Sequence, residues 1–229
     1  EETEKPLMDG RWDERTELLI GTEAADKLRH SHILIVGTGG VGGYAAEMLC
    51  RAGVGRLTLV DADVVNPSNI NRQIIALHST VGRSKVEVLA DRLLDINPRV
   101  KVYPVAAFLK DEAMEELLDA AKYDFVVDAI DSLSPKVFLI ALSKRRGLPV
   151  ISSMGAGAKR DTSLIEVADI ARSYNCTLAR AVRKRLRKLG ISRGVPVVFS
   201  SELPDESSVM EIEGERCKRS TAGTISYMP

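Results

Sequence analysis

Short apolar runs alternate along the chain with longer stretches in which apolar residues recur every three or four positions. The short runs are bounded by polar or turn-forming residues and predict buried strands, at residues 32–36, 56–60, 100–105, 125–127 and 150–152. The longer stretches predict helices at residues 44–52, 84–96, 111–121 and 135–144. Strands that alternate with crossover helices are typical of a doubly wound, mostly parallel sheet, so we expect an α/β fold.

The pattern changes after Gly155-Ala156-Gly157. Beyond this point we expect strands at residues 164–167, 195–200 and 224–227, and a strongly basic helix at residues 178–189. The first 30 residues predict a helical arm. Because no linker-like stretch separates these segments, we expect a single domain, made of an N-terminal arm (1–30), a core (31–155) and a C-terminal extension of helix and strands (156–229).

The composition excludes several classes of protein. With 45% hydrophobic residues among 229, the chain is not intrinsically disordered. Its longest stretch without a charged residue, Ser31 to Ala46, contains five glycines and is shorter than the roughly 18 apolar residues of a membrane span, so we expect no membrane contact. The acidic start is unlike a signal peptide, and the three cysteines form no CxxC pair, which disfavours a disulfide framework and a four-cysteine zinc site. These features predict a cytoplasmic protein.

The net charge is zero, but the charges are unevenly distributed. Residues 1–135 contain 15 Lys and Arg against 23 Asp and Glu, whereas residues 136–200 contain 14 against 3. A basic segment on an otherwise acidic chain indicates either a polyanionic partner or a solvated helix face, and charge alone does not separate the two.

A glycine-rich motif, Gly37-Thr38-Gly39-Gly40-Val41-Gly42, follows the first predicted strand and opens a helix. Glycine allows a tight turn and a close approach of phosphate oxygens, and the free N–H groups at a helix start attract negative charge. Asp61 lies 19 residues beyond Gly42, at the end of the next strand, where its carboxylate can accept hydrogen bonds from a ribose. The motif predicts a nucleotide site in a Rossmann-like fold and leaves NAD and ATP open.

The residues that follow favour ATP. Arg72 lies in the loop after the second strand, and Lys85 begins the next predicted helix. Two cations near the phosphates suit a reaction that breaks a phosphoanhydride, because charge accumulates on the departing pyrophosphate. Asp131 follows the strand at 125–127, where ligands of open α/β sheets bind, and its carboxylate could hold Mg²⁺.

With these motifs, residues 15–155 resemble the adenylating domain of the ubiquitin-activating and ThiF/MoeB superfamily. The resemblance implies phosphate contact by Gly40, ribose contact by Asp61, and Mg²⁺ near Asp131. It implies an ATP-binding set made of Gly37, Gly39, Gly40, Gly42, Asp61, Asn69, Arg72, Lys85 and Asp131. It also implies a catalytic set made of Arg72, Lys85, Asp131 and an arm arginine.

In this superfamily the arm arginine comes from the partner subunit. Arg15 is the best match in this chain and Arg11 the second. The resemblance therefore implies a composite site and a homodimer. The alternative is an arm arginine that pairs with Asp13 or Glu17 of its own chain, and the sequence does not separate the two.

The substrate follows from a second resemblance. Superfamily members that activate sulfur carriers usually have two CxxC pairs, which this chain lacks. Instead, four short segments resemble the tRNA threonylcarbamoyladenosine dehydratase family (TcdA/CsdL type), at 128–132, 155–158, 167–170 and 198–202. The resemblance implies ATP-dependent dehydration of N6-threonylcarbamoyladenosine in tRNA to its cyclic form. The threonyl carboxylate would be adenylated, and ring closure would release AMP.

The basic helix is then a candidate tRNA-binding surface. Five of its residues are assigned to nucleic-acid binding: Arg180, Arg183, Lys184, Arg187 and Lys188. Positions 180, 184, 187 and 188 share one helix face, and 183 flanks it. Such a face suits a phosphodiester backbone, with affinity that falls as salt rises. Cys217, between basic residues, is either a tolerated thiol or part of a sulfur relay.

Two further functions stay open from the sequence. One is an adenylyltransferase that activates the C-terminus of a ubiquitin-like sulfur carrier, as ThiF and MoeB do. The other is a non-catalytic scaffold that binds nucleotide and partners a cysteine desulfurase. A dehydrogenase is disfavoured by the cations near the expected phosphate site.

Overall fold

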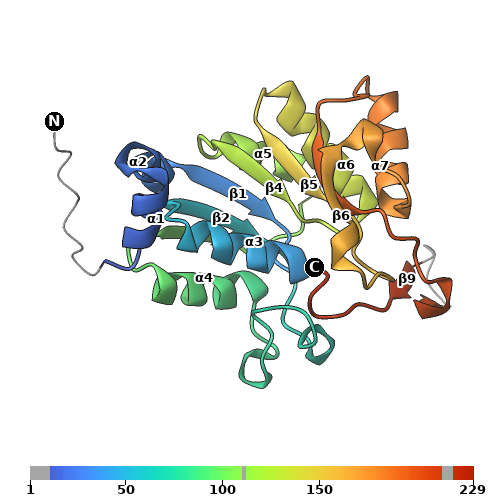
Figure 1. The fold of residues 1–229 in the computed structure, drawn as a ribbon, viewed down its shortest axis with the longest axis horizontal. Helices are drawn as coiled ribbons and strands as arrows, with labels where there is room; N and C mark the ends of the chain where they lie inside the picture. The colour runs from blue at the N-terminus through green and yellow to red at the C-terminus, as the bar shows by residue number, and fades with distance from the viewer. Residues whose placement is uncertain (1–10, 110–111, 213–218) are drawn as a thin grey trace.

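The fold is built around a seven-stranded sheet with helices on both faces (Figure 1). The computed structural model describes residues 11–109, 112–212 and 219–229. The strand order is β3-β2-β1-β4-β5-β7-β6, and every pairing is parallel except that of β6 with β7. The strands are β1 (His32–Val36), β2 (Arg56–Val60), β3 (Lys101–Val105), β4 (Phe125–Asp128), β5 (Val150–Ser153), β6 (Ile165–Asp169) and β7 (Pro196–Ser200). The expected doubly wound, mostly parallel sheet is confirmed.

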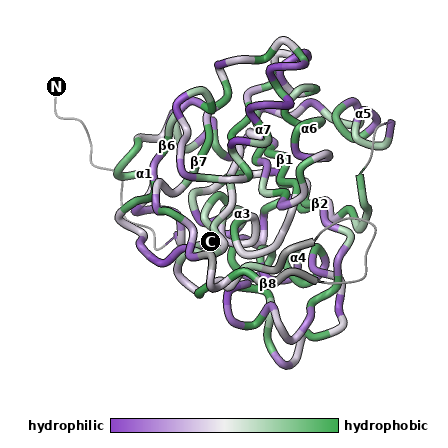
Figure 2. Tube along the Cα trace, turned by 90° about the vertical axis from the view of Figure 1, so that its right-hand side faces the viewer, coloured by the Kyte–Doolittle hydropathy of each residue, from purple (hydrophilic) through white to green (hydrophobic). Residues whose placement is uncertain are grey.

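The helices divide between the two faces of the sheet and create two cores. On one face, α3 (Gly40–Arg51) and α4 (Lys85–Ile96) pack on Ile33 and Ile35 of β1. On the other, α5 (Glu112–Asp119) and α6 (Leu133–Arg145) pack on Leu34 and Val36. Successive strand residues therefore face opposite cores, as the pleat requires. In Figure 2 hydrophobic and hydrophilic residues alternate along the helices, as expected where one side of each helix packs on the sheet.

Two helices form the described part of the N-terminal arm. They are α1 (Glu14–Ile20) and α2 (Thr22–His30), separated by Gly21, whose φ of 84° favours glycine. Arg29 of α2 ties them together, because its guanidinium lies 2.9 Å from the Asp13 carboxylate and 2.6 Å from that of Glu17. The predicted helical arm is confirmed for these residues.

The C-terminal segment differs from the prediction. A small antiparallel ribbon forms between β8 (Val209–Ile212) and β9 (Arg219–Ala222), and the strand predicted at 224–227 is wrong. Those residues form a turn in which the Met228 N–H donates to the Ile225 carbonyl. The Thr224 carbonyl accepts a hydrogen bond from the Asn71 side chain (3.0 Å) rather than from a strand. The turn brings the last residues beside the start of α3 (Figure 1).

The basic helix forms as expected, as α7 (Thr177–Lys188). Its buried residues, Ala179, Val182 and Leu186, pack in a third cluster with α6 and β7. None of the helices in the described ranges is both long and apolar enough to cross a membrane.

Candidate functional site

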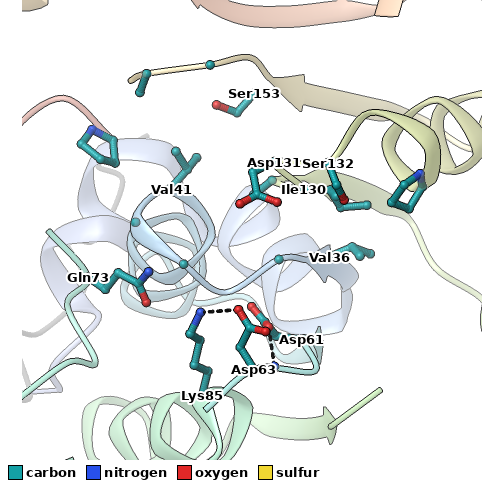
Figure 3. A pocket seen from close by; sticks show the side chains of 18 of the residues that line it. Val36, Val41, Asp61, Asp63, Gln73, Lys85, Ile130, Asp131, Ser132 and Ser153 are labelled. Carbon is teal, nitrogen blue, oxygen red and sulfur yellow. Dashed lines mark hydrogen bonds and ion pairs between the residues drawn. The ribbon is translucent and has the colours of Figure 1, made fainter. Parts of the chain in front are cut away.

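A cavity of about 440 Å³ opens at the carboxyl ends of the central strands (Figure 3). Gly37 follows β1, Asp61 follows β2, and Asp131 follows β4, and all three line it. The chain runs outward from β1 to β3 on one side of the sheet and from β4 onward on the other. The cavity therefore lies where the strand order reverses, which is where open α/β sheets bind ligands.

The glycine-rich loop forms one wall of the cavity. Gly37 has a φ of 90°, and a Cβ added to it would lie 2.6 Å from the Ala129 carbonyl oxygen. A Cβ on Gly42 would lie 1.7 Å from the Gly37 carbonyl oxygen, so these two glycines allow helix, loop and strand to pack closely. Gly39 and Gly40 line the cavity, and α3 begins at Gly40. The helix N-terminus thus faces the cavity and suits an anionic group.

Asp61 holds this loop in place. Its Oδ2 accepts hydrogen bonds from the backbone N–H of Thr38 (2.8 Å) and from the Thr38 hydroxyl (3.0 Å). Its Oδ1 accepts one from the backbone N–H of Asp63 (2.9 Å). A carboxylate oxygen can accept two hydrogen bonds, so Oδ1 keeps capacity for a ribose hydroxyl.

Lys85 lies at the floor of the cavity, where Figure 3 shows it beside Asp63. The lysine is only 5% exposed, and its Nζ lies 2.8 Å from Asp63 Oδ2. Asp63 itself is exposed. Asp63 has no signal of its own in the sequence, because its pairing with Lys85 accompanies a bridge between Val64 and Ser84 that no local pattern reveals.

Arg72 and Asn69 have different places in the same loop. Arg72 lines the cavity, and its Nη1 donates to the Ser68 carbonyl and to Asn71 Oδ1, both at 3.0 Å. Asn69 is buried and does not line the cavity. Its Oδ1 accepts the Asn66 N–H (3.0 Å), so Asn69 shapes the turn that precedes Arg72.

Gln73 is a lining residue that sequence analysis missed. It is buried, faces the cavity in Figure 3, and lies beside Gly39. Its Oε1 has no hydrogen-bond partner among the described residues. Buried acceptors are rarely left unpaired, so this oxygen is suited to a donor on a bound ligand. Its position directly after Arg72 in the loop is the only signal the sequence offers.

Asp131 lies at the opposite wall, exposed and without a hydrogen-bond partner in the described part of the chain. It stands across the cavity from Asp61, Asp63 and Lys85 (Figure 3). No group of three His, Cys, Asp or Glu residues suited to a metal ion occurs among the residues that the structure describes. A cation at Asp131 would therefore need further ligands from a bound molecule, such as phosphate oxygens.

The C-terminal extension closes the cavity from the other side. Leu178, in the first turn of α7, lines it together with the Gly155–Gly157 loop. Ala222, Thr224 and Pro229 complete this wall. The core and the extension thus meet at one cavity, and the start of α7 is part of it.

The structure alters the expected basic surface on α7. Four of the five assigned residues are exposed as predicted, namely Arg180, Lys184, Arg187 and Lys188. Arg183 instead is half-buried, and its Nη1 donates to the Ser173 carbonyl (2.8 Å) and hydroxyl (2.6 Å). Because these bonds hold the turn before α7, Arg183 is removed from the candidate surface.

The two candidate arginines of the N-terminal arm differ in their ion pairs. Arg11 pairs with Glu17 of its own chain at 2.8 Å, which was the alternative considered from the sequence. Arg15 is exposed, does not line the cavity, and has no ion-pair partner among the described residues. Of these two arginines, Arg15 is therefore the one without an ion-pair partner among the described residues.

Neither described cysteine is placed for catalysis. Cys50 is buried in the core, and burial raises the pKa of its thiol to about 11. Cys176 is buried before α7, where its sulfur accepts the Ala179 N–H (3.4 Å). Cys217 lies outside the described residues.

A second cavity, of about 830 Å³, lies between α3 and strands β4, β5 and β7. Its lining is mostly apolar, with Phe125, Ile151 and Phe199 among its members and Asp124 as its ionisable residue. No lysine or arginine is among the described residues that line it, so polyphosphate binding fits the first cavity.

Comparison with known proteins agrees with this geometry. The ThiF family model matches residues 14–228. The tRNA threonylcarbamoyladenosine dehydratase of Bacillus subtilis is 44% identical over 190 residues, which are 83% of this chain and 74% of that protein. The Escherichia coli enzyme of the same name is 40% identical, covering 86% and 76%. A molybdopterin-synthase adenylyltransferase from Salmonella typhimurium is 36% identical over 67% of this chain and 61% of that protein.

Solved structures of a tRNA threonylcarbamoyladenosine dehydratase are also similar to this chain. A crystal structure of the E. coli dehydratase TcdA in complex with ATP superposes with a TM-score of 0.82, at 39% identity, over 85% of this chain and 82% of that one. The complex of the same enzyme with AMP superposes with a TM-score of 0.83, at 36% identity, over 94% and 86%.

Proposed function

The chain belongs to the ThiF family, and on that premise we propose that it is an ATP-dependent tRNA threonylcarbamoyladenosine dehydratase. One observation carries the proposal: a glycine-rich helix start, two cations and a free carboxylate surround one cavity at the switch point of the sheet. The dehydratases of B. subtilis and E. coli are its relatives over most of its length.

In the proposed site the chain's residues bind and orient ATP. The N–H groups at Gly39 and Gly40 receive the phosphates, and Asp61 accepts a hydrogen bond from the ribose. Arg72 holds phosphate oxygens with its planar guanidinium. When ATP binds, the Lys85 ammonium contacts a phosphate in place of the Asp63 carboxylate. These two cations stabilise the charge that develops on pyrophosphate as it leaves.

The chemistry follows from the leaving groups. A carboxylate does not lose hydroxide readily, so the threonyl carboxylate of the modified adenosine attacks the α-phosphorus of ATP and pyrophosphate departs. The neighbouring carbamoyl group then attacks the acyl carbon, and AMP departs as the ring closes. Holding both groups on one substrate gives this step a high effective molarity. The reaction requires no covalent enzyme intermediate, and the two cysteines among the described residues are both buried.

Mg²⁺ is a further part of the proposal, and the residues fit it. Asp131 presents an unpaired carboxylate to the cavity, and Mg²⁺ is commonly held by one or two carboxylates together with substrate phosphates. When bound, the ion would neutralise charge on the triphosphate.

The exposed basic face of α7 supports tRNA as the substrate. Arg180, Lys184, Arg187 and Lys188 lie on this helix, and Leu178 at its start lines the cavity. A phosphate backbone bound along α7 would therefore run toward the reacting atoms. Binding would depend on charge and shape, and a tRNA substrate agrees with the expected cytoplasmic location.

A homodimer completes the proposed site. Arg15 cannot serve the cavity of its own chain, because it does not line it, but it is free to reach the cavity of a second copy. Helix α1 also exposes Leu18, Leu19 and Ile20, and Leu19 is 85% exposed. A second copy that covers this apolar stripe would bring the arginine with it.

ATP–pyrophosphate exchange tests the proposal. Exchange should depend on tRNA that carries threonylcarbamoyladenosine, and the same tRNA without the modification is the matched control. Exchange stimulated only by a small carrier protein with a C-terminal glycine would instead support the MoeB-like alternative. ATP binding without exchange under either condition would support the scaffold that partners a cysteine desulfurase.

A further inference from the structure

A fully buried ion pair lies beneath the wall of the cavity. Lys136 in the first turns of α6 and Asp128 at the end of β4 are both 0% exposed, and Lys136 Nζ lies 2.8 Å from Asp128 Oδ2. Ser152 of β5 donates its hydroxyl to the same oxygen at 2.5 Å. Neither charge touches the cavity, and the proposed chemistry uses neither.

The other oxygen of Asp128 points toward the site. Oδ1 accepts the backbone N–H of Ile130 at 3.1 Å. The residue before it, Ala129, is fixed by its N–H bond to the Val36 carbonyl of β1 (2.9 Å). The turn that presents Asp131 is therefore held on its N-terminal side by β1 and by the Asp128 carboxylate.

Stability alone does not account for this arrangement. A buried ion pair loses so much hydration that replacing it with apolar residues of similar size is often neutral or stabilising. What the pair adds is orientation, since Lys136 and Ser152 fix one oxygen of Asp128 and so direct the other at the Ile130 N–H. With its oxygens bonded to three donors, Asp128 is not the carboxylate that faces a ligand, although it lies in the same short motif as Asp131.

We infer that Asp128 and Lys136 are positioning residues, which hold the Ile130–Asp131 turn so that the Asp131 carboxylate meets the phosphates of ATP. The inference rests on the proposed function of Asp131. The positioning role belongs to the Asp128 oxygen that accepts the Ile130 N–H, and the negative charge of Asp128 has no part in it. A neutral side chain that still accepts the Ile130 N–H should then suffice.

Two double variants of similar size separate these possibilities. Asp128→Asn/Lys136→Met removes both charges and keeps an acceptor for the Ile130 N–H. Asp128→Leu/Lys136→Met also removes both charges but has no acceptor. The two are compared with the wild type by thermal melting, by modified-tRNA-dependent pyrophosphate exchange, and by ATP affinity measured calorimetrically with and without Mg²⁺.

The Asn/Met variant should keep kcat within about threefold of the wild type. The Leu/Met variant should melt close to the Asn/Met variant but lose about 100-fold in kcat, as expected for a misplaced group. It should also lose the difference in ATP affinity that Mg²⁺ causes in the wild type, a measurement that requires no turnover. Equal kcat and equal Mg²⁺ dependence in the two variants would overturn the inference. An inactive wild type would instead overturn the proposed function, and the calorimetric comparison would still decide the positioning role.

Discussion

The ammonium of Lys85 lies 2.8 Å from the carboxylate of Asp63, a residue at the opposite end of a long loop. Lys85 is almost completely buried, whereas Asp63 is exposed to the cavity mouth. A buried ammonium needs an anion beside it, and before ATP binds Asp63 provides one. Asp63 thereby accepts a hydrogen bond from the Lys85 ammonium at the place where phosphates would lie.

Replacing Lys85 separates its role from that of Asp63. Lys85→Met should lower kcat for modified-tRNA-dependent pyrophosphate exchange by about 100-fold, because a cation that stabilises the leaving group is lost. Asp63→Asn, the matched control, keeps the ammonium and should retain most of the activity. Steady-state exchange rates with melting curves for both variants check this. Near-normal turnover in Lys85→Met would remove that lysine from the site.

The basic face of α7 should determine tRNA affinity. Lys184→Glu/Arg187→Glu should weaken tRNA binding and leave the ATP affinity unchanged. The slope of log K against log salt concentration should become shallower by the amount expected when about two phosphate contacts are lost. Binding measured across a salt series gives both quantities. Lys122→Glu, an exposed charge reversal away from α7, serves as the control. An unchanged salt slope would make this helix a solvated face only.

Arg183 should behave differently from its neighbours on the same helix. Its guanidinium bonds the turn at Ser173, so Arg183→Gln should lower the melting temperature by leaving buried acceptors unpaired. The salt dependence of tRNA binding should stay as in the wild type. Thermal melting beside the same salt series distinguishes a structural arginine from one that contacts phosphate.

Glu17 should titrate at unusually low pH. Hydrogen bonds from Arg29 and then Arg11 lower the pKa of its carboxyl to about 2. Because the pKa is lower folded than unfolded, this contribution to stability is present above the ordinary value of 4.5 and is lost as pH falls toward 2. An NMR titration of Glu17 should give that midpoint, and Arg29→Gln should raise it. The same midpoint in both proteins would show that Arg29 does not set it.

Mixed dimers test whether Arg15 acts in trans. Arg15→Ala and Arg72→Ala proteins should each be inactive alone, because each lacks one part of every site. Equal mixing after subunit exchange should restore about one quarter of wild-type activity, since half the dimers carry one intact site. No recovery in a mixture shown to contain heterodimers would place Arg15 outside the active site.

The sequence predicts the central strands well because they are buried on both faces. Residues 33–36 form a continuous apolar run and residues 57–60 are buried throughout, and the ends of both strands are where the pattern places them. Helix α3 begins at Gly40 rather than at the expected Tyr44, because the helix start packs against the strand and loop despite its weak helix formers. Ile225 and Tyr227 alternate like a strand, but Met228 closes a turn onto Ile225.

Some residues of the candidate site could be predicted from the sequence, and others could not. Gly40, Arg72 and Lys85 belong to local motifs, and the structure brings them to one cavity. Gln73 and Asp63 also line that cavity, although the sequence assigned a role to neither. The bond between Lys136 and Asp128 also depends on the meeting of β4 and α6 in three dimensions, which periodicity does not describe.

Mass spectrometry of the tRNA tests the central claim most directly. tRNA carrying threonylcarbamoyladenosine is incubated with the protein and ATP, digested, and compared with samples that lack ATP or contain Lys85→Met. We predict that the hypermodified nucleoside loses the mass of one water only with ATP and the wild-type protein. An unchanged nucleoside, under conditions in which the protein adenylates a small carrier protein, would contradict the account.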